Sequence, residues 1–130
     1  MVKIKFFLLF LASTLLSACQ NDKPPTDAPP TIRIAFGSCA HQDKDQPLLN
    51  VAAALNPDVF LFLGDNIYGD TRDMDTLRAK YAKLAAKAEF QNLCNQTRVL
   101  AVWDDHDYGE NDSGRHYPFK AESKEIFMDF

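Results

Sequence analysis

The chain has 130 residues, enough for one domain, and its apolar (46%) and charged (25%) fractions are those of an ordinary globular protein. Eighteen acidic residues against fourteen Lys and Arg give a formal net charge of -4. This balance argues against a nucleic-acid-binding surface, because phosphate backbones are bound by clustered Lys and Arg side chains.

The N-terminus has the pattern of an export signal. Two lysines precede an apolar run over residues 6–16, which Ser17-Ala18-Cys19 follows. The run is shorter than the roughly 20 residues that a membrane-spanning helix needs, so residues 1–18 are predicted to be a signal peptide. Small residues before a cysteine resemble the lipobox of bacterial lipoproteins, which implies cleavage before Cys19 and its lipidation. The alternative is an ordinary secretory signal.

A lipid on Cys19 would anchor the protein to a membrane. Gln20 after the cysteine favours the outer membrane, with the protein facing the periplasm or the cell surface. Residues 19–31 are interpreted as the lipidated cysteine and a Pro-rich tether, since the prolines come without any large apolar residue before Thr31 and the segment cannot bury enough surface to fold. Residues 32–130 are the predicted folded part.

Three short runs rich in Ile, Val, Phe and Leu predict buried strands, at residues 32–36, 59–63 and 99–103. Helical patterns alternate with them, over residues 47–55, 75 to about 90, and 120–130. This order predicts an α/β fold class, with parallel strands joined by crossover helices. Because ligands collect beyond the carboxyl ends of parallel strands, the three loops after the strands are expected to converge on one edge.

The second predicted helix has a basic face. Arg78, Lys80, Lys83 and Lys87 lie opposite its apolar residues. We interpret this stripe as a solvated helix face rather than a phosphate-binding patch.

Export would place the chain in an oxidising compartment, where spare cysteines tend to pair. Cys39 and Cys94 remain once Cys19 is lipidated, and one disulfide between them is possible. Cys39 has a competing role as a metal ligand, and Cys94 is interpreted as a buried small residue.

Metal-ligand residue types follow every predicted strand: Cys39 the first, Asp65 and Tyr68 the second, Asp104 and Asp105 the third. Asp65 comes directly after a glycine at a strand end, so its carboxylate can approach closely and bridge two ions. Thiolate and phenolate ligands from Cys39 and Tyr68 require a strongly polarising ion and favour iron over zinc. The surrounding carboxylates suit a hard cation such as calcium.

The segment from Trp103 to Asp107 concentrates acidic and imidazole side chains, His106 among them, which repel one another unless cations hold them. The structural alternative is that acidic residues after strands form turns and cap helices, which is our interpretation of Asp70. His41 and His116 have no comparable cluster of acidic residues beside them in the sequence and are interpreted as surface residues.

Other catalytic motifs are missing from the sequence. It contains no Gly-x-x-x-x-Gly-Lys phosphate loop, no Gly-x-Ser-x-Gly nucleophile elbow and no Gly-x-Gly-x-x-Gly segment, and Gly109 and Glu110 break a calcium-loop pattern that starts at Asp105. Nucleotide binding and serine hydrolysis therefore lose their usual support.

Three segments together resemble the PhoD-like alkaline phosphatase family of calcineurin-like metallophosphoesterases: Phe-Gly-Ser-Cys at 36–39, Gly-Asp-Asn-Ile-Tyr-Gly-Asp at 64–70 and Trp-Asp-Asp-His-Asp at 103–107. The resemblance implies an α/β/β/α sandwich, of which this chain holds the first three strands with their crossover helices. It also implies a two-metal or three-metal site with ferric iron and calcium, other divalent metals being possible, that hydrolyses phosphate monoesters or diesters.

The same resemblance assigns roles to residues. Cys39, Asp65 and Tyr68 fall on the iron side, with Asp65 shared between ions, and Asp105 is a further metal ligand. His106 falls at the phosphate-facing position, where it would stabilise transition-state charge or protonate the leaving oxygen.

Asp104 and Asn111 are weaker candidates, Asp104 as a metal ligand and Asn111 as a substrate contact. Enzymes of this family carry further ligands in a C-terminal half, and this chain ends in a helical pattern over residues 124–130 without a cap. We therefore expect an N-terminal fragment that is inactive alone, with no prediction of oligomeric state. The alternative is a catalytically inactive lipoprotein whose acidic loops bind structural calcium or nothing.

Overall fold

A three-stranded parallel sheet in the order β1-β2-β3 forms the centre of the fold. The computed structural model describes residues 30–130, so the predicted signal peptide, Cys19 and the tether up to residue 29 lie outside the described residues. The strands are β1 (Ile34–Gly37), β2 (Val59–Leu63) and β3 (Arg98–Val102). Their register pairs Phe36 with Leu61 and Leu61 with Leu100. The predicted α/β class is confirmed at this level.

The helices of the described part are α1 (Pro47–Ala54), α2 (Met74–Ala85), α3 (Ala88–Gln96), α4 (Asp105–Tyr108) and α5 (Lys120–Asp129). None of them is both long and apolar enough to cross a membrane. Each has a local origin: α1 starts with a proline, which suits the first helical turn, and the Asp73 carboxylate caps α2 by accepting from the Thr76 N–H at 2.9 Å.

The prediction of a single helix from residue 75 to about residue 90 is wrong. Lys87 is extended (φ -70°, ψ 132°) and separates α2 from α3. The break changes the surface against which the chain packs: Leu84 of α2 belongs to a cluster with Ile126 of α5, whereas Leu93 of α3 packs with Phe62 of the sheet. Apolar spacing alone continues through the break, and only these two packing surfaces require the chain to turn.

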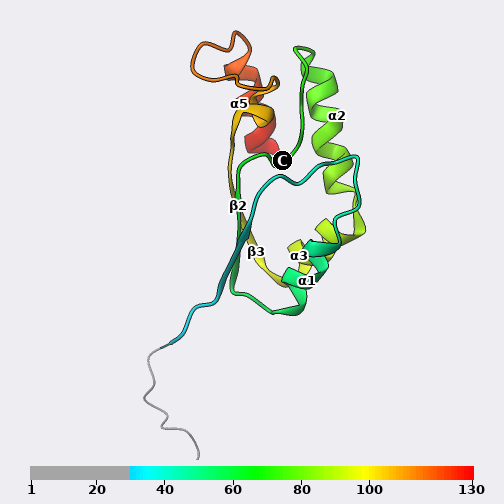
Figure 1. Cartoon of the computed structure of the whole chain (residues 1–130), viewed down its shortest axis with the longest axis vertical. Helices are drawn as coiled ribbons and strands as arrows, with labels where there is room; N and C mark the ends of the chain where they lie inside the picture. Colours follow the sequence, from blue (N-terminus) through cyan, green and yellow to red (C-terminus); the bar gives the residue numbers. More distant parts are fainter. Residues whose placement is uncertain (1–29) are drawn as a thin grey trace, which may run out of the picture. The chain divides into compact units, whose positions relative to one another are not determined.

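One face of the sheet carries the main core. Ala35, Phe60, Phe62 and Val99 point to this face and pack with residues of α1 and α3. In Figure 1, α1, α2 and α3 all lie to the same side of the strands. A second cluster joins α2 to α5.

The opposite sheet face is apolar and uncovered within residues 30–130. Five of its large side chains are between 44% and 69% exposed: Ile34, Phe36, Leu63, Leu100 and Val102. The prediction of buried strands therefore holds for the face toward the helices and is wrong for the other, because alternate residues of a strand point to opposite faces and helices cover one of them.

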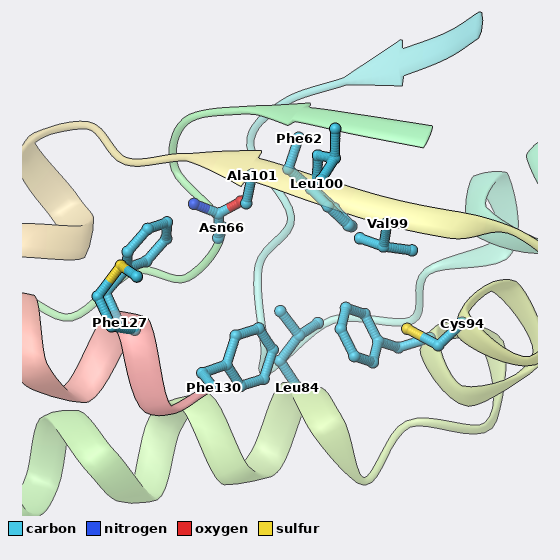
Figure 2. A pocket seen from close by; sticks show the side chains of 11 residues that line it. Phe62, Asn66, Leu84, Cys94, Val99, Leu100, Ala101, Phe127 and Phe130 are labelled. Atoms are coloured by element: carbon cyan, nitrogen blue, oxygen red, sulfur yellow. The ribbon is translucent and has the colours of Figure 1, made fainter. Parts of the chain in front are cut away.

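An apolar pocket of about 420 Å³ opens at the edge of the sheet between β3, α3 and α5. Aromatic and aliphatic side chains line it, together with Cys94 and the buried amide of Asn66 (Figure 2). Cys94 itself is exposed, which corrects its interpretation as a buried residue. The core is incompletely filled at this edge, where dispersion contacts are lost.

A fully buried carboxylate, Asp107 of α4, ties the loops to the helices. It accepts hydrogen bonds from the Asn66 N–H at 3.1 Å, the Tyr81 hydroxyl at 2.7 Å and the Asp104 N–H at 3.0 Å, and also from the Asn66 side chain and the Ile67 N–H. Burial raises the pKa of Asp107 above its usual range, while the hydrogen bonds from Tyr81 and the backbone act in the opposite direction.

Removing one donor tests this role. Tyr81→Phe leaves the ring in place but deletes the hydroxyl that faces a buried charge, so the free energy of unfolding should fall by about 1.5–3 kcal/mol. Urea unfolding followed by circular dichroism measures the change. Tyr108→Phe is the matched control, because the Tyr108 hydroxyl makes no hydrogen bond within residues 30–130. Equal midpoints for the two variants would contradict the prediction.

Candidate metal centre

The three loops after the strands meet at one end of the sheet, as predicted. The Cys39 N–H donates to the Gly64 carbonyl at 3.2 Å, which joins the loops after β1 and β2. The Gly69 N–H donates to the His106 carbonyl at 3.1 Å, which joins the loops after β2 and β3. Residues that are 25 to 40 positions apart in sequence are thereby held side by side.

Two glycines permit this close approach. A Cβ on Gly64 would lie 2.8 Å from the Cβ of Asp104, and Gly64 also has a φ of +105°. A Cβ on Gly69 would lie 2.6 Å from the His106 carbonyl oxygen. Any side chain at either position would push the loops apart.

Three site residues without a glycine's freedom adopt left-handed backbone conformations: Cys39 (φ 60°), Asp65 (φ 49°) and Asp70 (φ 44°). Asp tolerates this region better than most residues, whereas Cys does not, and the cost is of order 1 kcal/mol or more per residue. Backbone strain of this kind persists only where surrounding contacts maintain it. The left-handed backbone sets the direction in which each of the three side chains leaves the loop.

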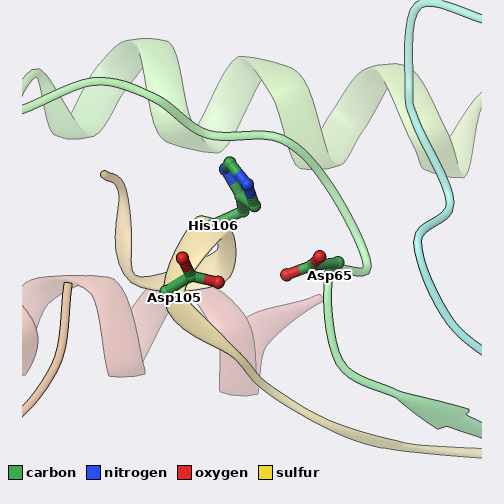
Figure 3. A group of neighbouring side chains, drawn as sticks. All are labelled: Asp65, Asp105 and His106. Carbon is green, nitrogen blue, oxygen red and sulfur yellow. The ribbon is translucent and has the colours of Figure 1, made fainter. Parts of the chain in front are cut away.

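The side chains of Asp65, Asp105 and His106 converge. One ligand atom from each lies within 4.8 Å of the others. Figure 3 shows Asp65 reaching from the loop after β2 toward Asp105 and His106 on α4. The two carboxylates are donors that a divalent or trivalent cation can use, and the imidazole lies beside them.

Cys39 and Tyr68 border this cluster, Cys39 beside Asp65 and Tyr68 with its ring centroid 4.3 Å from that of His106. The Cys39 thiol donates to the Asp65 carboxylate with a sulfur-to-oxygen distance of 3.6 Å. Hydrogen bonding to Cys39, burial and the charges of Cys39, Asp65 and Asp105 raise the pKa of Tyr68 to about 12. The phenol is therefore neutral in the metal-free protein, and its ligation requires an ion that displaces the proton.

The Asp65 carboxylate has an oxygen that is available to a cation. Its Oδ1 is buried and has no hydrogen-bond partner within the described residues. Burial, together with the charges of Asp105 and Asp104, raises the pKa of Asp65, although His106 and Cys39 act in the opposite direction. A buried carboxylate oxygen without a donor is costly, and a metal ion would satisfy it.

Asp105 behaves differently. Burial alone would raise the pKa of Asp105, but the N–H groups of Asp112 and His106 and the charge of His106 bring it below its usual range. Asp105 is therefore an anion even without a metal. This makes it the more readily available of the two carboxylate ligands at neutral pH.

The two weaker candidates lie outside the three-residue cluster. Asp104 caps α4 by accepting the Asp105 N–H at 2.9 Å, and its side chain is exposed. Asn111 is exposed and donates to the Asp112 carboxylate at 2.7 Å. Their roles in metal or substrate binding stay predictions. Asp107 also faces away from the cluster, because its oxygens accept protein donors.

Two partly exposed residues beside the site make specific contacts that their prediction as surface residues does not include. The His41 ring stacks on Tyr68 with centroids 4.7 Å apart and planes 16° apart. Lys80 donates to the carbonyls of Tyr68 at 3.1 Å and Gly69 at 2.6 Å, so it fastens the loop after β2 to α2. Neither contact has a local sequence signal, because each joins separate elements.

Cysteine pairing is also resolved. Cys39 and Cys94 are both free thiols. Cys39 thus remains available as a metal ligand, as its competing role required.

Comparison with family models, with curated proteins and with solved structures gives no match for this chain. The functional argument therefore rests on its residues and their geometry.

The ionisation of His106 can be tested directly. Burial alone would lower the pKa of His106, but the hydrogen bond from Nδ1 to Asp70 at 2.8 Å and the nearby carboxylates raise it above about 6.5. Proton NMR titration of the metal-free protein should find this raised value. Asp70→Asn should lower it, and asparagine suits the left-handed backbone there.

The linkage has a definite sign. A raised histidine pKa contributes stability that is complete below the unfolded pKa of about 6.5 and is lost as pH rises through the folded pKa. The free energy of unfolding should therefore decline with pH just above 6.5 in the wild type, with a smaller decline in Asp70→Asn. A wild-type His106 that titrates at or below about 6.5 would contradict this.

Proposed function

We propose that this site takes part in metal-dependent hydrolysis of phosphate monoesters or diesters by the intact parent protein. The observation that carries the proposal is the convergence of Asp65, Asp105 and His106, with an unpartnered buried oxygen on Asp65. Cys39 and Tyr68 extend the donor set on one side. The resemblance to PhoD-like phosphatases, carried by the same residues, supports the same reaction class.

The donor set supports ferric iron with calcium as the metals. Thiol and phenol are softer or less acidic donors that a strongly polarising ion deprotonates, and the carboxylates suit calcium. Bound cations would supply Lewis-acid polarisation of the phosphoryl oxygens. Asp65 lies between the thiol and the second carboxylate, which agrees with its proposed sharing between two ions.

His106 is proposed as the proton donor. A carboxylate only accepts hydrogen bonds, so Asp70 directs the Nδ1 proton of His106 toward itself and leaves Nε2 for the substrate. The raised pKa of His106 favours the protonated imidazole over the neutral one. Such a group can stabilise charge on the phosphoryl oxygens or protonate the leaving oxygen.

The finer features of the fold and location are part of the proposal. The uncovered apolar sheet face is of the kind that a second sheet covers in an α/β/β/α sandwich, which supports the metallophosphoesterase architecture. The lipobox-like segment at Cys19 supports export and a lipid anchor, at an outer membrane facing the periplasm or the cell surface.

Activity tests the proposal directly. Hydrolysis of p-nitrophenyl phosphate and its bis ester by the intact parent protein is measured with added iron and calcium, before and after chelation. Asp65→Asn should abolish chelator-sensitive turnover, and His106→Ala should lower kcat by about 10²–10⁴-fold. Asp73→Asn is the control, because asparagine caps α2 equally well. Calcium binding without hydrolysis would favour the alternative of a catalytically inactive, cation-binding lipoprotein.

Iron ligation has its own readout. Ferric iron should produce a visible charge-transfer band from the Tyr68 phenolate and the Cys39 thiolate. The band should weaken in Tyr68→Phe and in Cys39→Ser and disappear in the double variant, while Tyr108→Phe leaves it unchanged. A band that survives the double variant would show that iron binds elsewhere.

A further inference from the structure

A second pocket, of about 390 Å³, adjoins the proposed metal centre. It is lined by Cys39, His41, Lys44, Asp45, Gln46 and Tyr68. Two of these, Cys39 and Tyr68, are proposed metal ligands, so the pocket and the proposed metal centre share two residues. Its size suits a small organic group.

Hydrogen bonds and stacking preorganise the pocket. The Gln46 side chain donates to the His41 carbonyl at 2.7 Å, and the Lys44 N–H donates to the same oxygen at 3.0 Å. Gln42 is buried and holds the Tyr68 backbone with two hydrogen bonds, of 3.1 and 2.9 Å. These residues are ordered before a ligand binds, which lowers the entropic cost of binding.

The pocket presents one charge of each sign. Lys44 and Asp45 both line it, and neither forms an ion pair with any residue of the described part. The neighbouring carboxylate, Asp43, is the one that pairs with Lys83. The cation and the anion at the pocket are therefore free for a ligand.

We propose that this pocket receives the alcohol group of the phosphate ester and selects groups that carry both a carboxylate and an ammonium. Lys44 binds the carboxylate and Asp45 binds the ammonium. A group with a single charge would leave the opposite residue unpaired or repelled. The simplest matching substrate is an O-phosphorylated hydroxy amino acid.

This inference rests on the proposed function. In the reaction, the oxygen of water forms the new bond to phosphorus and the bond between phosphorus and the alcohol oxygen breaks. The alcohol oxygen receives a proton from His106, and the attacking water keeps one proton on the phosphate and loses the other to solvent, from which His106 regains its proton. The products are phosphate and the free hydroxy amino acid.

The test compares esters that differ only in leaving-group charge. With the metal-loaded intact parent protein, kcat/KM is measured for O-phospho-L-serine, 3-phosphoglycerate, phosphoethanolamine and glycerol 1-phosphate. We expect O-phospho-L-serine to be preferred over glycerol 1-phosphate by about fivefold or more. Lys44→Gln should remove the increase in kcat/KM that a carboxylate on the leaving group confers. Asp45→Asn should remove the increase that an ammonium confers.

Controls separate selection from general damage. The readout is therefore the ratio of kcat/KM for each charged ester to kcat/KM for glycerol 1-phosphate in the same variant. Lys87→Gln, which removes a charge outside the pocket, should change none of these ratios. Unchanged ratios in Lys44→Gln and Asp45→Asn, or an equal loss for all four esters, would overturn the inference.

Failure of the proposed function has a different signature, since the wild type would then hydrolyse none of the esters. In that case the pocket is tested by ligand binding without turnover. O-phospho-L-serine should shift the amide NMR signals of residues 41–46 in the wild type and far less in Lys44→Gln. No shift in the wild type overturns the pocket as well.

Discussion

The site depends on the hydrogen bonds that the buried carboxylate of Asp107 accepts. This carboxylate gathers donors from the loop after β2, from α2 and from the start of α4 into one point without solvent. A buried charge is tolerated only when such donors surround it, so the loops cannot separate without exposing or stranding it. Asp65 adjoins one of these donors, Asn66, and His106 adjoins Asp107 itself. The ligands are thus positioned by a residue that does not face them.

Four consecutive polar residues consequently have four different roles. Asp104 caps α4, Asp105 is an anion at the cluster, His106 is paired with Asp70, and Asp107 is buried. Their backbone is shared, but the helical turn of α4 sends each side chain in a different direction. This separation explains how so many titratable groups lie together without all competing for one cation. It also leaves the strained Asp65 to face the cluster with an unpartnered oxygen.

The sheet shows a corresponding asymmetry. Helices α1 and α3 bury one face, whereas Phe36, Leu100 and Val102 remain exposed on the other. An apolar patch of this kind on a soluble protein normally marks a surface that binds something. The site does not depend on that face, because the loops that build it are tied to α2 and α4.

Much of the fold followed from the sequence. Apolar runs located the strands, the spacing of Leu77, Tyr81 and Leu84 located α2, and the carboxyl ends of parallel strands had to bring the ligand-rich loops together. These features depend on local periodicity and on chain direction. The tertiary structure alone decided the stacking of His41, the role of Lys80, the break at Lys87 and which sheet face is covered. Each depends on contacts between distant segments, and a residue pattern specifies that a side chain is apolar or charged but not which partner it meets.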